Sequence, residues 1–84
     1  MAMPTVLRLD GLRVMIYTND HRPAHVHVIS TEGEAVFVLN CPEGPPELRE
    51  RHGVSLRTVN RMQKELAFHL SVLCPKWREF HGDY

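Results

Sequence analysis

The sequence predicts an α+β domain: a four-stranded antiparallel β-meander with one C-terminal amphipathic helix packed on one face. In the first half, apolar and polar residues alternate with a period of two, which is typical of half-buried antiparallel strands. In the last third, apolar residues recur at steps of three and four, as they do on one face of a helix. Because the chain has 84 residues, we expect residues 1–84 to form a single domain with a small core.

The first two strands are expected at residues 5–9 and 12–17. Between them lies Asp10-Gly11, a dipeptide that suits a tight hairpin because both central positions need a positive φ. Apolar residues alternate through the second strand and would share one face: Leu12, Val14 and Ile16. We expect this face to be buried.

The third and fourth strands are expected at residues 24–30 and 35–39, joined by a turn at 31–34. Residues 40–54 contain three prolines and two glycines, a composition that interrupts strand pairing. We therefore predict an irregular connection there, with one short helical turn at 47–51.

The helix is expected to begin after Ser55, whose side chain can accept a hydrogen bond from the first-turn amides. Its apolar face repeats at helical spacing: Leu56, Val59, Met62, Leu66, Leu70 and Leu73. Pro75 lacks an amide hydrogen, so the helix should end or kink near Cys74. Trp77 and Phe80 would then pack as a short tail.

Ten basic and ten acidic side chains cancel, so the net charge does not support binding to nucleic acid or to an anionic membrane. The segment 55–78 has a local excess of positive charge, because it contains five basic residues and only one acidic residue, Glu65. This segment could meet phosphate or an acidic protein. An ordinary solvated helix surface explains the same pattern, since no aromatic residues are interleaved with the charges.

The two cysteines, Cys41 and Cys74, follow no metal-binding or redox spacing, and the first residues do not resemble a secretion signal. We therefore expect reduced thiols and a cytoplasmic location. The longest uncharged run, residues 66–75, is shorter than the roughly 20 residues needed to cross a bilayer. No association with a membrane is expected.

Half of the six histidines lie within residues 21–27. His25 and His27 are two residues apart in an expected strand, where such residues point to the same side with α-carbons roughly 6.5–7 Å apart. Asp20 and His21 lie in the turn that leads into the strand. These side chains could form a compact site without help from distant sequence.

Three interpretations of this cluster stay open. His21, His25 and His27 could bind a divalent transition metal such as zinc, since neutral imidazole is a common metal ligand. Alternatively, His25 and His27 could act as acid and base in an RNase or hydrolase, with Arg13 or Arg22 holding a phosphate. The third interpretation is a half-exposed strand without chemistry, because polar residues alternating with valines are common there.

One helix can cover only one face of the sheet, and the valine face is the natural one. The histidines would then lie on the uncovered face with Arg13 and Tyr17, on a shallow polar surface. The remaining histidines are scattered and are expected to be surface or partly buried residues without a ligand role: His52, His69 and His81.

Phe68 and Val72 lie four residues apart, off the main apolar stripe of the helix. They could form a second apolar strip that binds a partner chain, or they could pack into the core of a wide helix face. A small core gains stability from a partner that covers apolar surface. We therefore expect an interaction module that forms a homodimer or binds a small protein partner.

The whole chain resembles a family of small bacterial proteins known as domain of unknown function four-one-six-zero. The resemblance rests on Met-Pro-Thr-Val at 3–6, on Asp-His-Arg-Pro-Ala-His-Val-His-Val at 20–28, and on Trp-Arg-Glu-Phe at 77–80. Residues 33–35 and 52–55 resemble the turn and the helix entry of that family. The resemblance implies a neighbouring gene for a second small protein and candidate membership of a toxin–antitoxin pair, without an established activity.

The chain departs from the family pattern at two positions. Ala24 replaces the second of two prolines, which loosens the turn that positions His21. Pro75 interrupts a last helix that is usually continuous in the family.

Overall fold

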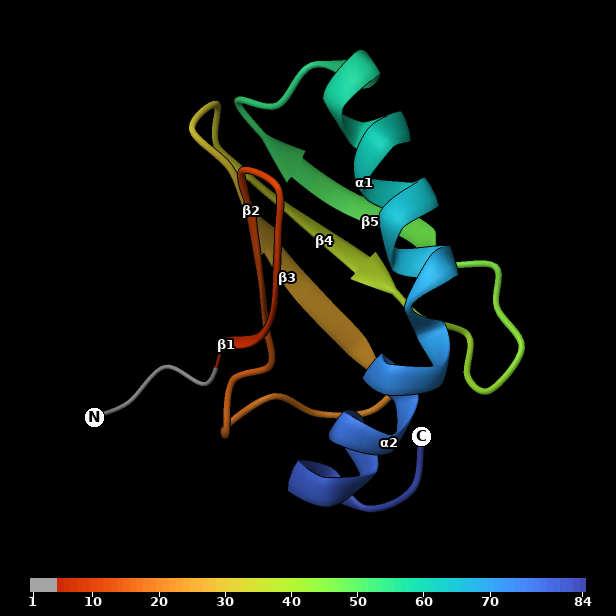
Figure 1. Cartoon of the computed structure of the whole chain (residues 1–84). Helices are drawn as coiled ribbons and strands as arrows, with labels where there is room; N and C mark the ends of the chain where they lie inside the picture. The colour runs from red at the N-terminus through yellow and green to blue at the C-terminus, as the bar shows by residue number, and fades with distance from the viewer. Residues whose placement is uncertain (1–4) are drawn as a thin grey trace.

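The computed structural model describes residues 5–84, so Met3 and Pro4 of the family-like start lie outside the described residues. Five antiparallel strands form one sheet in the order β1-β2-β3-β4-β5, and both helices lie along one side of it (Figure 1). The elements are β1 (Thr5–Leu9), β2 (Leu12–Met15), β3 (His25–Ile29), β4 (Glu34–Val38), β5 (Glu47–His52), α1 (Leu56–Phe68) and α2 (Leu70–His81). The predicted α+β class and the meander of the first four strands are confirmed.

The prediction of four strands was wrong because β5 occupies residues expected to form a loop with a helical turn. All six residues of β5 are exposed, and four of them are charged at neutral pH, so the sequence lacks the apolar alternation of a strand. Leu48 pairs with Phe37 and Glu50 with Val36, which leaves Arg49 as an extra residue in a bulge. Charged side chains and a bulge are typical of an edge strand, because they discourage pairing with another chain.

The prediction of one helix that ends or kinks near Cys74 was also wrong. The helical segment is interrupted at His69, whose N–H donates to the carbonyls of Glu65 and Leu66. Pro75 lies inside α2, where it removes one backbone hydrogen bond while its ring stays exposed. The expected tail therefore continues α2, and Trp77 belongs to this helix. Neither helix in residues 5–84 is long and apolar enough to cross a membrane.

The core lies between the helices and the sheet face that the alternation predicted. The expected strand residues are fully buried there: Val14, Ile16, Val26 and Val28. From the helices, the apolar residues that pack against them include Val59, Met62, Leu66, Leu73 and Trp77. The predicted assignment of the valine face to the core is confirmed.

Cys41 and Cys74 form a disulfide with α-carbons 5.8 Å apart, so the prediction of reduced thiols was wrong. The bond links the β4–β5 connection to α2. A separation of 33 residues gives no sign in the sequence that these two segments meet. The expected cytoplasmic location rested on the cysteine spacing and on the first residues of the sequence. The disulfide removes the first of these supports, because stable disulfides are rare in the cytosol.

Glu32, in the turn between β3 and β4, caps the start of α1. Its carboxylate accepts hydrogen bonds from the Ser55 N–H, at 2.9 Å, and from the Thr58 hydroxyl. Ser55 is the predicted N-cap, and its hydroxyl oxygen accepts from the Thr58 N–H. The hydrogen bond from the Ser55 backbone N–H, followed by the one from the Thr58 hydroxyl, lowers the pKa of Glu32 below its usual value.

Reducing the disulfide should lower the free energy of unfolding by about 3.5 kcal/mol, because a loop of this length regains entropy in the unfolded chain. The measurement is thermal unfolding with and without dithiothreitol, alongside a count of free thiols in the native protein. We expect no reactive thiol before reduction. Two reactive thiols in the native protein, together with a Tm that does not respond to reduction, would contradict this bond.

The lowered pKa of Glu32 predicts a specific acid dependence. Its stabilising effect is fully present above its ordinary pKa of 4.5 and is lost as the pH falls through the lower folded-state pKa. Glu32→Gln should therefore reduce Tm at pH 7 and flatten the fall in Tm below pH 4.5. Glu43→Gln, an exposed carboxylate in the next connection, is the matched control. Equal acid dependence in both variants would argue against the cap.

Candidate metal centre

His25 and His27 lie on the same face of β3, as the spacing predicted. In the sheet, His27 pairs with Met15 of β2 and Val36 of β4, on the side opposite the buried Val26 and Val28. The expected open polar surface is not found, because His25 is only 6% exposed and His27 is half-buried. The prediction of two solvent-facing rings was wrong.

The second helix accounts for the burial of His25. Figure 1 shows α2 passing the end of the sheet where β3 begins. The Trp77 ring lies with its centre 5.3 Å from that of His25, and the His81 ring packs on Trp77 at 4.3 Å. His81 Nε2 lies 3.0 Å from the Tyr17 carbonyl oxygen. A helix that continues beyond Pro75 thus closes one side of the histidine pair.

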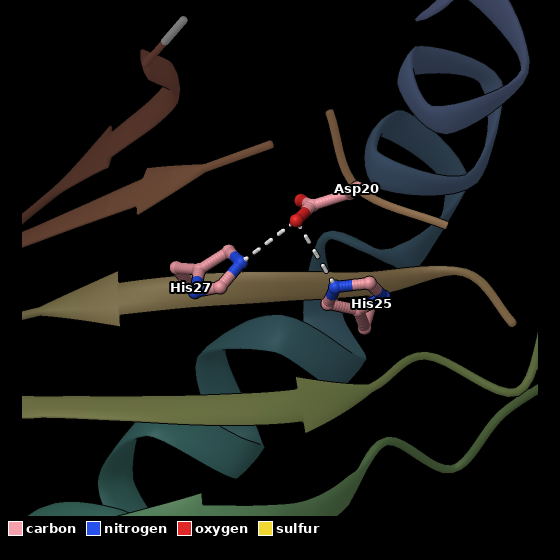
Figure 2. Close-up of side chains that lie close together, drawn as sticks. All are labelled: Asp20, His25 and His27. Carbon is pink, nitrogen blue, oxygen red and sulfur yellow. Dashed lines mark hydrogen bonds and ion pairs between the residues drawn. The ribbon is translucent and has the colours of Figure 1, made fainter. Parts of the chain in front are cut away.

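Asp20 is held in the connection between β2 and β3. The Tyr17 N–H donates to Asp20 Oδ2 at 2.9 Å, and the Asp20 N–H donates to the Tyr17 carbonyl at 3.1 Å. This reciprocal pair fixes the carboxylate and leaves Oδ1 pointing toward the histidines (Figure 2). Oδ1 lies 3.4 Å from His25 Nε2 and 3.3 Å from His27 Nε2.

These three side chains form a set of atoms with metal-ligand geometry. One ligand atom from each of Asp20, His25 and His27 lies within 4.8 Å of the other two. Two ligands of a tetrahedral ion, each about 2.1 Å from it, are roughly 3.4 Å apart. The two distances to Asp20 Oδ1 fit this separation, and the histidine ligand atoms lie within 4.8 Å of each other, so the three groups can converge on one ion.

The other ring nitrogen of each histidine, Nδ1, also lies within hydrogen-bonding distance of an oxygen atom. His25 Nδ1 lies 2.8 Å from the Pro23 carbonyl oxygen, and His27 Nδ1 lies 3.3 Å from Glu34 Oε2. A histidine that binds a metal commonly donates its second N–H to a carbonyl or a carboxylate, which orients the ring. Both rings of this pair have that arrangement, with Nε2 directed at Asp20.

The hydrogen bonds of the pair need more protons than neutral rings supply. All four ring nitrogens face acceptor oxygen atoms, namely the Pro23 carbonyl and the carboxylates of Asp20 and Glu34. Two neutral imidazoles carry one N–H each, so two of the four contacts would bring lone pairs together. Either additional protons or a cation between the Nε2 atoms and Asp20 Oδ1 removes this repulsion.

His21, which was expected as a ligand, is exposed and lies outside this set among the described residues. Arg13 and Arg22, the expected phosphate-binding cations, are also exposed. Of the scattered histidines, His52 is exposed beside Glu50, His69 marks the helix break, and His81 contacts Trp77.

Sequence reasoning missed Glu34 and Trp77. Glu34 had a usable signal, because a β3–β4 hairpin that pairs His27 with Val36 places Glu34 diagonally opposite on the same face. Trp77 had none, because its contact with His25 depends on where α2 passes the sheet.

A family model described as "Domain of unknown function (DUF4160)" matches residues 11–78 of the chain. No curated protein and no solved structure matches the chain significantly.

The Tyr17 ring lies against His27, with ring centres 4.2 Å apart. Burial raises the pKa of the Tyr17 phenol, and the charges of Glu34 and Asp20 raise it further, while Arg13 lowers it. In a Tyr84→Phe background, Glu34→Gln should bring this pKa partly back toward its ordinary value, because burial persists. Absorbance at alkaline pH measures it. Glu43→Gln should leave the pKa unchanged, and an equal response in both variants would contradict the proximity of Glu34 to the phenol.

Proposed function

The chain belongs to the DUF4160 family, whose description names no function, and we propose from the site geometry that it binds a divalent transition metal through Asp20, His25 and His27. The convergence of the two Nε2 atoms on one carboxylate oxygen carries this proposal. A metal ion there accepts both Nε2 lone pairs and Asp20 Oδ1. The two remaining N–H groups then donate to Pro23 and Glu34, and every contact is satisfied.

The ligand types narrow the class of ion. Imidazole suits zinc, copper, iron and nickel, whereas magnesium and calcium prefer sites made of oxygen ligands alone. Two histidines and one carboxylate are the protein ligands of many catalytic zinc sites and of non-haem iron(II) sites. We therefore propose zinc or iron(II) as the ion, with Asp20 rather than His21 as the third ligand.

Metal-assisted hydrolysis, including RNA cleavage, is the second candidate function. Three protein ligands leave at least one position of the ion open to water, and zinc lowers the pKa of a bound water to about 7. Such a water would be the nucleophile. His25 and His27 would then be ligands, which excludes their use as free acid and base, and Arg13 or Arg22 would meet a phosphate from the exposed side.

An interaction module in a toxin–antitoxin pair remains a proposal that rests on the family resemblance. Its support from the structure is the exposure of the expected partner strip, since Phe68 is 82% exposed and Val72 42% exposed. Core packing therefore does not account for these two residues. A cytoplasmic location and a homodimer or small protein partner belong to the same proposal, and copurification with the product of a neighbouring gene would test it.

Zinc titration by calorimetry should give one ion per chain. His25→Ala and His27→Ala should each weaken binding at least a hundredfold, because two protein ligands cannot replace three. Glu34→Gln should weaken it about 10- to 100-fold, since it loses the partner that orients His27. A Kd that is unchanged in the His25 and His27 variants would reject the site.

The matched control is His21→Gln, which removes an exposed histidine four residues from His25. We expect its zinc affinity to equal that of the wild type. If His21→Gln weakens binding while Asp20→Asn does not, the third ligand is His21, as the sequence predicted. Tm values measured without metal will show whether each variant folds.

A further inference from the structure

The outer face of α1 carries a row of residues that the proposed metal centre does not use. Arg57, Arg61, Lys64 and Phe68 follow one another at steps of four, three and four residues. At about 100° per residue, all four project within roughly 60° of one another. The buried residues of α1 point the opposite way: Val59, Met62 and Leu66. The row therefore forms the outermost line of the helix, and we call it the α1 stripe.

The three cations of the α1 stripe are available to a ligand. Each is exposed, and within residues 5–84 none of them forms an ion pair. The Arg61 guanidinium donates to the Asp10 carbonyl, but a guanidinium has five N–H donors and keeps others free. With Asn60 and Glu65, the cations line a hollow of about 560 Å³.

Phe68 ends the stripe with a large apolar surface in water. Its side chain is 82% exposed, the highest value among the exposed large hydrophobic residues described. The neighbouring His69 ring packs against it in a T-shaped arrangement, with ring centres 5.1 Å apart. This contact braces the ring while leaving most of it uncovered. A solvated helix surface accounts for the cations, but not for a phenylalanine in line with them. The expectation that no aromatic residue accompanies these charges was therefore wrong, because Phe68 follows Lys64 one helical turn later.

We propose that the α1 stripe binds a single-stranded polynucleotide, with phosphates on Arg57, Arg61 and Lys64 and a base stacked on Phe68. Cations that follow the backbone, combined with an aromatic platform for bases, are the usual elements of single-strand binding. The helix rises roughly 10.5 Å from residue 57 to residue 64. A stacked strand carries one phosphate per about 3.4 Å, so this length meets about three phosphates.

Other partners fit the stripe less well. A second copy packed on the same face would bring six cations together around the two phenylalanines. A duplex keeps its bases stacked inside and offers no partner for Phe68. An acidic peptide would satisfy the cations, but it has no requirement for an aromatic ring in line with them. The proposal is independent of the metal centre, because no stripe residue contacts Asp20, His25 or His27 in the hydrogen bonds, ion pairs and ring contacts described.

The test is fluorescence anisotropy of a labelled 15-nucleotide single-stranded RNA of mixed sequence, titrated with the full chain at 50 mM salt. We expect the logarithm of the association constant to fall linearly with the logarithm of the salt concentration. The slope should be near −2 for three phosphate contacts. Arg57→Gln/Arg61→Gln/Lys64→Gln should abolish it. Phe68→Ala should weaken it about tenfold with an unchanged salt slope, because it removes stacking alone.

Controls separate stacking from charge. Arg8→Gln/Arg49→Gln/Lys76→Gln removes three cations elsewhere, and Phe80→Ala removes an aromatic ring from α2, so both should bind RNA like the wild type. Inorganic polyphosphate, which has phosphates but no bases, should compete weakly, and its competition should not change in Phe68→Ala. Single-stranded DNA of the same sequence shows whether the sugar matters.

Four results would overturn the proposal. They are no binding at low salt, equal affinity for duplex and single strand, an affinity that Phe68→Ala leaves unchanged, and concentration-dependent dimerisation that Phe68→Ala abolishes while RNA has no effect. Circular dichroism of each variant establishes that it folds, which we expect because the stripe residues point away from the core.

Discussion

The arrangement of the site depends on two imidazoles that meet acceptor oxygens at all four of their ring nitrogens. His25 and His27 each face an acceptor at both ring nitrogens, and Asp20 Oδ1 is shared by the two Nε2 atoms. An uncompensated contact between lone pairs in a partly buried site is unfavourable, so the geometry requires positive charge at this point. One divalent ion supplies that charge without added protons. The need for positive charge beside Asp20 therefore connects the structure of the β2–β3 connection with the proposed binding of a metal ion.

The fold builds the site from elements that have other roles. The period of β3 sends its valines into the core and its histidines to the other face, while the β2–β3 connection returns Asp20 toward them. The second helix then covers His25 with Trp77. The Cys41–Cys74 disulfide anchors α2 one turn before Trp77, so the cover and the core are held together. Loss of that anchor would loosen the same helix that shields the histidine pair.

The sequence was sufficient where local patterns decide the structure. Alternation identified the first four strands, Ser55 was the correct helix start, and the spacing of His25 and His27 placed them on one face. Prediction from the sequence failed where the structure depends on contacts between residues far apart in the chain. The charged strand β5 resembles a loop, because an edge strand avoids apolar residues. Pro75 is tolerated in α2, and the burial of His25 follows from the position of that helix rather than from its neighbours in the chain.

The most direct test of this account is long-range ¹H–¹⁵N NMR of the histidine rings, recorded before and after one equivalent of zinc. We expect the Nε2 signals of His25 and His27 to shift together on zinc addition, while both Nδ1 atoms keep their protons and hydrogen bonds to Pro23 and Glu34. The His21 ring, exposed to solvent, should not respond. Unchanged Nε2 signals in the His25 and His27 rings at saturating zinc would contradict the account.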